Sequence, residues 1–344
     1  MNDLDYIELA AQFAKKADKA LTFENPRVGA LIVKNDVILS TGYHEKFGND
    51  HAEINAFNNL ANKSDVVDAT LYVTLEPCAV DGKVSSCARE IRNWHLNRVV
   101  IGDLDPNPDT HGLGVEILRD AGINVTVLNT QHSFEINSEF YFYFEKRLPY
   151  VQLKLATSRN GFVSNSSDHR LKLTDYIADQ DVHHERAKRS AIVIGSQTFL
   201  KDRPLLNVRY NTISHNQPLR IVIDRRARLK KFANQLDTNW LIYTEDIDFY
   251  KSFDYVLLIN DGLMGVLKDL ESRHIQSVLV EGGPTLLQSF LDEDLWNEMI
   301  IYQTDHFILD GKLEVVLPKI EPIEKNHVGN SNKIIYVNST KESL

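Results

Sequence analysis

The stretch TLYVTLEPCAVDGKVSSC, residues 70–87, carries both cysteines of this 344-residue chain, and the tripeptide HAE precedes it at residues 51–53. One imidazole and two thiolates, from His51, Cys78 and Cys87, give zinc three protein ligands. They leave a fourth position for water, which is typical of a catalytic rather than a structural site. Glu53 stands two residues after the histidine, where a carboxylate can move protons without binding the metal. We therefore expect one catalytic Zn²⁺ per chain.

Other interpretations of these residues stay open at this point. The two cysteines could form a disulfide or lie as inert buried thiols, and a His-x-Glu pair is common by chance. The order of the four residues, with Pro77 directly before Cys78, favours zinc. It is the arrangement of zinc-dependent nucleobase deaminases, in which zinc-activated hydroxide attacks a ring carbon that bears an amino group. Glu53 would then take the proton of the water, protonate the ring nitrogen and assist the loss of ammonia.

Composition narrows the class of protein further. The length predicts two domains at roughly 150 residues each. No run of ~18 apolar residues exists, so we expect no membrane span. The N-terminal residues are acidic and lack a basic region before an apolar one, so we expect no secretory signal. Two cysteines without a signal predict a cytoplasmic protein, because thiolates stay free in a reducing compartment. The formal net charge of −10 argues against a nucleic-acid partner, because such binders usually carry a basic face.

Strand and helix patterns alternate through the first half of the chain. Asp50 is a good N-cap, which predicts that His51 and Glu53 lie in the first turn of a helix. Both metal-binding segments then sit at helix starts, where the backbone favours thiolates. The alternation predicts an α/β layer with helices on both faces of a sheet. Expected helices cover 4–20, 86–94, 112–120 and 131–146, and expected strands cover 28–34, 37–42, 70–74, 98–102 and 123–128.

The run KRLP at residues 146–149 predicts a boundary between domains 1–147 and 148–344. The second half is again α/β. The run VEGGPT at 280–285 leads a strand into two glycines and a helix with proline at its start, a turn that can bring backbone N–H groups close to a phosphate. Expected strands cover 150–156, 191–194, 219–224, 240–243, 255–259, 277–280 and 334–337, and expected helices lie near 175–189, 263–272 and 284–291.

The spacing of the cysteines separates subfamilies of deaminases. Cytidine, guanine and tRNA-adenosine deaminases usually have two residues between them, and this chain has eight. The long spacer resembles that of the bifunctional riboflavin-biosynthesis deaminase–reductases of the RibD type. So do NPRVG at 25–29, TLEPC at 74–78, DPNP at 105–108 and the junction at 146–154. The resemblance implies an N-terminal cytidine-deaminase-like three-layer α/β domain and a C-terminal dihydrofolate-reductase-like α/β domain.

The resemblance also implies two activities: zinc-dependent deamination of a diamino-pyrimidinone ribose phosphate, then reduction of its ribosyl group to ribityl by NADPH. It implies a homo-oligomer and a small-molecule substrate. The implied substrate contacts are Asn25 and His44 for the base, Lys83 for the phosphate, and Lys154, Asp202, Arg209 and Glu281 in the reductase pocket. The implied NADPH contacts are Thr174, Gly195, Thr198 and Gly283. Each also has a structural interpretation, as a turn glycine, a helix cap, or a loop or surface side chain.

The chain departs from the family pattern at several positions. Val80 stands where the family has a histidine, Val84-Ser85-Ser86 replaces Thr-Pro-Pro, Asn160 replaces an aspartate and Lys172 replaces a tryptophan. The segment 303–306 lacks the family's leucine-glycine motif. Alternatives are therefore an active deaminase with a diverged or silent reductase half, or a deaminase with a shifted substrate. A polynucleotide deaminase and a non-catalytic zinc-stabilised module are the remaining hypotheses.

Overall fold

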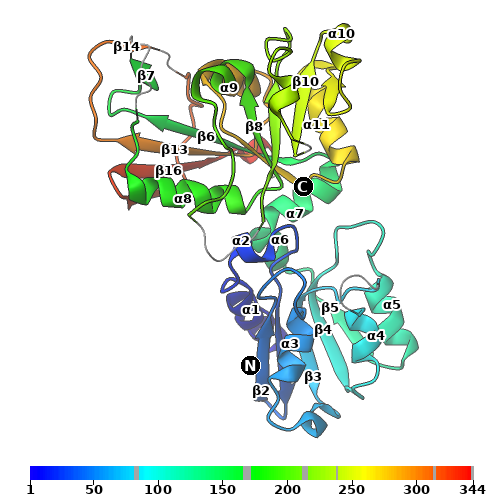
Figure 1. Cartoon of the computed structure of the whole chain (residues 1–344). Helices are drawn as coiled ribbons and strands as arrows, with labels where there is room; N and C mark the ends of the chain where they lie inside the picture. The colour runs from blue at the N-terminus through cyan, green and yellow to red at the C-terminus, as the bar shows by residue number, and fades with distance from the viewer. Residues whose placement is uncertain (81–84, 166–171, 211–215, 238, 313–314, 342–344) are drawn as a thin grey trace. The chain divides into compact units, whose positions relative to one another are not determined.

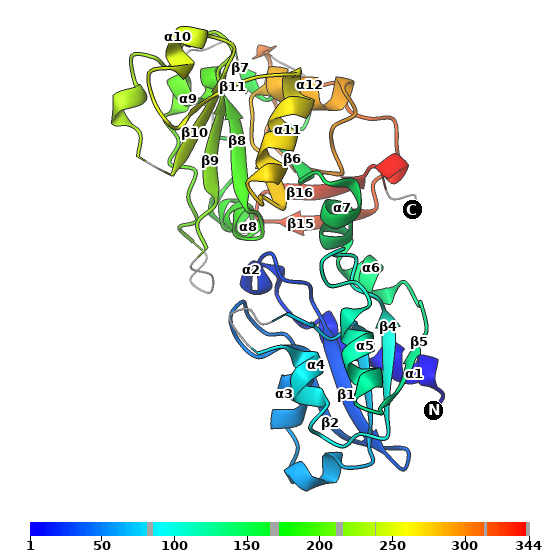
Figure 2. The same cartoon turned by 90° about the vertical axis from the view of Figure 1, so that its right-hand side faces the viewer.

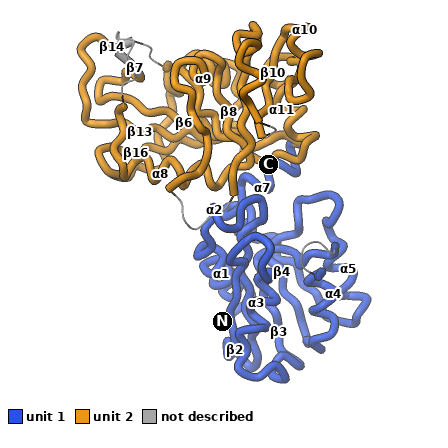
Figure 3. The backbone as a smooth tube through the Cα atoms, in the orientation of Figure 1, with its two compact units in different colours: residues 1–146 blue, residues 147–344 orange. Residues whose placement is uncertain are grey.

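The computed structural model describes residues 1–80, 85–165, 172–210, 216–237, 239–312 and 315–341. The chain forms two units, Met1–Lys146 and Arg147–Leu344 (Figure 3). The boundary in the structure therefore falls between residues 146 and 147, one residue before the boundary that the sequence predicts. Lys83 and Val84, singled out from the sequence, lie outside the described residues.

A five-stranded sheet forms the centre of the first unit, in the order β2-β1-β3-β4-β5 (Figure 1). Strand β1 pairs antiparallel with β2 and β3, and β3, β4 and β5 are parallel. The strands are β1 (Gly29–Lys34), β2 (Val37–Tyr43), β3 (Thr70–Leu75), β4 (Arg98–Asp103) and β5 (Asn124–Val127). The helices are α1 (Asp3–Ala14), α2 (Lys19–Thr22), α3 (Ala52–Asn58), α4 (Cys87–Ile91), α5 (Leu113–Asp120), α6 (His132–Ile136) and α7 (Ser138–Lys146), with a 3₁₀ turn at Lys63–Val66.

Alternation along the strands produces the two faces of this sheet. Leu71 and Val73 pack with α3, α4 and α5, whereas Tyr72 between them packs with α1. Figure 2 shows α3 and α4 on one side of the sheet and α1 on the other. The first unit is therefore a three-layer α/β domain, as the sequence predicts.

Local structure in this unit corrects three expectations. The helix expected over 4–20 ends at Ala14, and Asp18 caps the separate helix α2 by accepting a hydrogen bond from Ala20. The helix expected over 131–146 is interrupted at Asn137, where φ is −128°. The N-cap of α3 is His51 rather than Asp50, and its ring makes no cap hydrogen bond because it faces the two cysteines instead.

The second unit contains a nine-stranded sheet in the order β11-β10-β9-β8-β12-β6-β13-β16-β15. The seven strands from β11 to β13 are parallel, and β16 and β15 extend the sheet antiparallel. The strands are β6 (Tyr150–Thr157), β8 (Ala191–Gly195), β9 (Leu219–Ile223), β10 (Trp240–Thr244), β11 (Val256–Leu258), β12 (Ser277–Val280), β13 (Glu298–Thr304), β15 (Glu324–Val328) and β16 (Ser331–Val337), with a separate pair of β7 (Ser164–Asn165) and β14 (Gly311–Lys312).

Helices cover both faces of this second sheet. Leu267 of α11 and Phe290 of α12 belong to the core of one face, and Phe199 of α9 and Phe249 of α10 to that of the other. The helices are α8 (Tyr176–Ala187), α9 (Ser196–Asp202), α10 (Ile247–Tyr250), α11 (Gly262–Ser272) and α12 (Pro284–Asp292), with 3₁₀ turns at Ala233–Gln235 and Ser339–Lys341. None of the helices in the described parts of the chain has the length and apolar character needed to cross a membrane.

Most expected elements of the second unit are present, but its last third is more regular than expected. The sequence predicts only one strand at 334–337, whereas β13, β15 and β16 form a continuous part of the sheet. Strand β15, EKNHV, is an exposed edge strand with a polar sequence, so it carries no alternating apolar pattern.

Candidate active site

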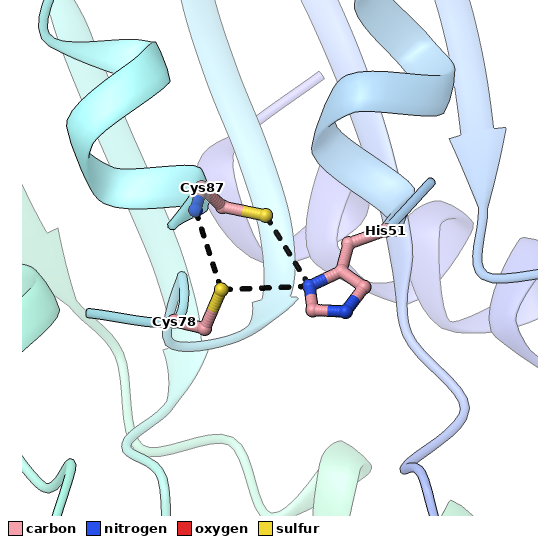
Figure 4. A group of neighbouring side chains, drawn as sticks. All are labelled: His51, Cys78 and Cys87. Carbon is pink, nitrogen blue, oxygen red and sulfur yellow. Dashed lines mark hydrogen bonds between the residues drawn. The ribbon is translucent and has the colours of Figure 1, made fainter. Parts of the chain in front are cut away.

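Three side chains meet at one point of the first unit (Figure 4). The ligand atoms of His51, Cys78 and Cys87 all lie within 4.8 Å of one another. His51 Nδ1 is 3.5 Å from Cys78 Sγ and 3.3 Å from Cys87 Sγ. A tetrahedral zinc with ordinary Zn–N and Zn–S bond lengths separates such atoms by roughly 3.6 Å. The donor set and its spacing therefore fit zinc, and the cysteines are free thiols rather than a disulfide.

Local structure brings the two cysteines together. Cys87 is the first residue of α4, and its backbone N–H donates to Cys78 Sγ at 3.2 Å. Ser86 caps the same helix, and its hydroxyl donates to the Cys78 carbonyl at 2.8 Å. A helix start favours negative charge on the sulfur atoms. Hydrogen bonding from Cys87, followed by that of His51, lowers the pKa of Cys78 to about 4, so this thiol is prepared to bind a cation.

Glu53 lies in the first turn of α3, beside these ligands, and is buried. Burial raises the pKa of its carboxyl to about 7, although the adjacent His51 opposes the shift. A group with a pKa near neutrality can both accept and donate a proton at physiological pH. Its burial beside the ligands and its raised pKa agree with the proton-transfer role expected from the sequence.

Asn25 and His44 lie together next to the metal ligands. The His44 ring stands edge-on to the His51 ring, with 5.3 Å between the centroids. His44 Nδ1 is 3.1 Å from the Asp50 carbonyl, which can only accept, so Nδ1 carries the hydrogen. Burial lowers the pKa of His44 and favours its neutral form, so Nε2 accepts from Asn25 Nδ2 at 3.2 Å. This orientation leaves Asn25 Oδ1 as an acceptor for a ligand N–H.

Glu76 is a buried residue whose contribution the sequence does not reveal. Its two carboxylate oxygens accept four backbone N–H groups, from Asp105, Gly112, Gly114 and Val115, at 2.9–3.2 Å. Glu76 precedes Pro77 and Cys78, so these bonds hold the metal-binding segment against the start of α5. The only signal in the sequence is its place in the TLEPC motif.

In the second unit, Glu281 follows β12 and pairs with Arg186 of α8. Arg186 Nε and Nη2 lie 2.5 and 2.8 Å from the two carboxylate oxygens. Burial alone would raise the pKa of Glu281, but Arg186, then Lys154 and His183, outweigh it and lower the pKa to about 2. Sequence reasoning missed Arg186, which is one of several charged residues on its helix.

Arg209 joins this group through the same helix. Its backbone N–H donates to His183 Nδ1 at 3.1 Å, and its guanidinium donates to Asn207 Oδ1 at 2.6 Å. Arg186 Nη1 donates to the Asn207 carbonyl at 3.2 Å. The structure thus connects two expected pocket residues, Arg209 and Glu281, through Arg186. Within the described residues we find no hydrogen bond or ion pair from Asp202, the last residue of α9, to this group.

Two of the residues expected near NADPH, Gly195 and Gly283, lie at the carboxyl ends of adjacent parallel strands, and Thr198 lies in the first turn of α9. Gly195 ends β8 and caps α9, and Gly283 follows β12 and caps α12. The Gly283 N–H donates to Thr198 Oγ1 at 3.1 Å. Backbone N–H groups at a helix start such as that of α9 suit a phosphate of a dinucleotide. At the start of α12 the Gly283 N–H is bonded to Thr198 and Pro284 has no N–H, so the start of α9 is the one that fits the cofactor.

Thr174 lies on the segment that leads into α8. Asp175 rather than Thr174 is the N-cap, and the Thr174 hydroxyl donates to Asp179 Oδ1 at 2.6 Å. Asn330, between β15 and β16, holds the same segment: its Oδ1 accepts from the Asp175 N–H and its Nδ2 donates to the Leu173 carbonyl, both at 3.0 Å.

Two departures from the family pattern have structural explanations. Asn160 Nδ2 donates to the Ile308 carbonyl at 2.8 Å, and Asn160 Oδ1 accepts from the Ile308 N–H at 3.1 Å. An aspartate could make only the second of these bonds. Lys172 forms an ion pair with Asp179 at 2.7 Å. Both side chains therefore have structural partners.

Comparison with known families matches both halves of the chain. Residues 1–103 match the family described as the cytidine and deoxycytidylate deaminase zinc-binding region, and residues 149–308 match the RibD C-terminal domain. Riboflavin biosynthesis protein RibD of Aquifex aeolicus (strain VF5) is 36% identical over 319 residues, which cover 90% of this chain and 88% of that protein. The RibD of Escherichia coli (strain K12) is 33% identical and covers 94% of this chain and 93% of its own length.

Solved structures show the same likeness over nearly the whole chain. Form 1 of Acinetobacter baumannii RibD superposes with a TM-score of 0.82 at 29% identity, covering 97% of this chain and 98% of that one. The diaminohydroxyphosphoribosylaminopyrimidine deaminase/5-amino-6-(5-phosphoribosylamino)uracil reductase of Thermotoga maritima superposes with a TM-score of 0.77 at 29% identity, covering 97% of each chain.

Proposed function

The chain belongs to the RibD family of riboflavin biosynthesis, and from this premise we propose that it performs two successive reactions on one pyrimidine ribonucleotide. The first is hydrolytic deamination of 2,5-diamino-6-ribosylamino-4(3H)-pyrimidinone 5′-phosphate. The second is reduction of the ribosyl group to ribityl by NADPH. We assign deamination to residues 1–147 and reduction to residues 148–344.

The observation that carries the deaminase proposal is the meeting of His51, Cys78 and Cys87 beside the buried Glu53. These three ligands would hold zinc, which when bound lowers the pKa of a water molecule and so supplies the nucleophile. The Glu53 carboxylate accepts a proton from that water and delivers it to the ring nitrogen. Asn25 Oδ1 contacts the base, the neutral His44 holds Asn25 in that orientation by accepting from its Nδ2, and Lys83 is proposed to bind the phosphate.

For the reductase, we assign NADPH to Gly195, Thr198, Gly283 and Thr174, and the sugar phosphate to Lys154, Asp202, Arg209 and Glu281. Bound NADPH supplies the hydride. The cationic Lys154 and Arg209 suit a phosphate. Arg186 binds both oxygens of the Glu281 carboxylate and so fixes its orientation. The two bonds between Asn160 and Ile308 show only that the fold accommodates this departure, so the choice between an active and a silent reductase rests on the NADPH assay.

We further propose a homo-oligomer that works in the cytoplasm. Phe307, Leu309 and Ile323 are large apolar side chains with 65%, 92% and 67% exposure. Exposed apolar side chains of this size support association with a second copy of the chain. The thiolate ligands need a reducing compartment. Light scattering after size-exclusion chromatography measures the mass of the assembly, and a mass of one chain contradicts the oligomer.

Purified, zinc-loaded protein tests the two activities. With the diamino-pyrimidinone nucleotide and NADPH, we expect ammonia release and NADPH oxidation, and a zinc chelator should abolish the first. Ammonia without NADPH oxidation would identify an active deaminase with a silent second half. Neither signal from the zinc-bound protein would contradict the proposed substrate.

A further inference from the structure

Asn137 interrupts the helical region between α6 and α7 and holds a distant loop with its side chain. Its Oδ1 accepts from the Arg27 N–H at 2.7 Å, and its Nδ2 donates to the Arg27 carbonyl at 3.0 Å. Asn137 is buried, with 5% exposure, and lies 110 positions after Arg27 in the sequence. A third contact, from Nδ2 to Ser133 Oγ at 3.4 Å, orients the amide.

The loop held in this way carries Asn25. Only Pro26 separates Asn25 from Arg27, and its ring fixes φ at about −65° and restricts the residue before it. Fixing the Arg27 backbone therefore restricts the direction of the Asn25 side chain. The guanidinium of Arg27 adds a bond to the Ile136 carbonyl, so the loop is attached to the end of α6 at two points.

The same loop is hydrogen-bonded to His44, which follows β2. Val28 directly follows Arg27, and its carbonyl accepts from the His44 N–H at 3.0 Å. The His44 ring accepts from Asn25 Nδ2 at 3.2 Å. The Gly29 N–H donates to Thr74 Oγ1 at 3.2 Å on the strand that leads to Cys78. The loop thus spans from α6 to the metal ligands, and Asn137 is its anchor at one end.

We infer that Asn137 is a positioning residue for deamination, which keeps Asn25, held by His44, aimed at the pyrimidine ring. This inference rests on the proposed deaminase function. The two bonds require a side chain that both donates and accepts in one plane, so asparagine suits this position and aspartate or leucine does not. The kink between α6 and α7 is the consequence: Asn137 leaves helical geometry so that its amide can reach the backbone of Arg27.

The test compares Asn137→Ala with Asn137→Asp in the full-length, zinc-loaded chain. We expect Asn137→Ala to raise the KM of the pyrimidine nucleotide at least tenfold in ammonia release, with kcat within about threefold and the zinc content unchanged. Asn137→Asp keeps the bond from the Arg27 N–H and loses the bond to the Arg27 carbonyl. Its KM should therefore lie between those of the wild type and Asn137→Ala. The KM for NADPH in the reductase assay should not change. Asn62→Ala removes the amide that caps the 3₁₀ turn at Lys63–Val66, which among the described residues has no hydrogen bond to Arg27 or Asn137, and should retain the wild-type KM.

Hydrogen exchange gives a readout that needs no substrate. In Asn137→Ala the peptide covering residues 23–29 should exchange about tenfold faster, whereas peptides of β3 and α4 should not change. A wild-type KM in either Asn137 variant, or unchanged exchange over 23–29, overturns the positioning role. Absence of ammonia release from the wild-type protein, in contrast, refutes the proposed function, and the exchange result then still decides whether Asn137 holds the loop.

Discussion

Replacing Glu281 by glutamine should destabilise the second unit in a pH-dependent way. The carboxylate is bound by two nitrogens of Arg186, and the two side chains are 9% and 11% exposed. Its pKa lies at about 2 in the folded protein, against an ordinary value of 4.5. This difference corresponds to about 3 kcal/mol of stability at pH 7. The variant also leaves Arg186 buried without its partner, which acts in the same direction.

The sign of the pH dependence follows from the lowered pKa. A carboxyl whose pKa falls on folding stabilises the folded state above pH 4.5, and this contribution disappears as the pH falls toward 2. At pH 3 the wild type should keep only about 1 kcal/mol of it. The difference between wild type and Glu281→Gln should therefore shrink by about 2 kcal/mol between pH 7 and pH 3.

Tryptophan fluorescence in urea can follow the second unit alone. The chain has three tryptophans, and Trp94→Phe leaves only Trp240 and Trp296, both in the second unit. In this background we expect a lower urea midpoint for Glu281→Gln at pH 7. Glu245→Gln is the matched control, because its ion pair with Arg225 is exposed, and pairs of that kind contribute at most about 1 kcal/mol. Equal midpoints for wild type and Glu281→Gln at pH 7, or a difference independent of pH, would refute the reasoning.

Three further predictions concern the ligand sites. Glu53→Ala should retain a full equivalent of zinc and lose ammonia release by several orders of magnitude; more than a tenth of the wild-type rate contradicts its role in proton transfer. Cys78→Ser or Cys87→Ser should lower the zinc content measured by elemental analysis, and a full equivalent of metal in either variant would refute that ligand. Asn330→Ala removes both bonds that hold the segment of Thr174 and should weaken NADPH binding about tenfold in a fluorescence titration. Asn332→Ala, on the same hairpin, should bind NADPH as the wild type does, and identical affinities for all three proteins would show that Asn330 has no part in the cofactor site.

The sequence predicts this fold well where apolar runs are strong. In β3 the unbroken apolar run Leu71-Tyr72-Val73 is typical of a strand covered on both faces, and the two clusters place helices on each face. The expected strands 28–34 and 37–42 leave only Asn35 and Asp36 for the connection between β1 and β2, and the structure has a turn there with φ of 52° and 59° at the two residues. The failures lie where a distant contact decides the local structure. Asn137 has no pattern of its own, and the backbone of Arg27 is what interrupts the helix there.

The residues of the candidate site also fall into those that the sequence reveals and those that only the structure reveals. His51, Glu53, Cys78 and Cys87 are apparent from the sequence because zinc chemistry demands particular residue types in a particular order. Arg186 is not apparent, because its ion pair joins it to Glu281, 95 positions away in the sequence. Glu76 is not apparent either, because its four partners are backbone N–H groups, which leave no pattern in the sequence. Family resemblance adds the residues of the reductase pocket, which the composition of the second half would not have revealed.

The central claim, two successive reactions in one chain, is tested most directly by stoichiometry. The diamino-pyrimidinone nucleotide would be supplied with NADPH to the wild-type chain and to Glu53→Ala, and ammonia and oxidised NADPH would be counted together. The account predicts one NADPH oxidised per ammonia released by the wild type. It predicts neither signal from Glu53→Ala, with NADPH oxidation restored when the deaminated nucleotide is supplied. Oxidation of NADPH by Glu53→Ala without prior deamination would contradict the proposed order, and ammonia release without any NADPH oxidation by the wild type would contradict the second reaction.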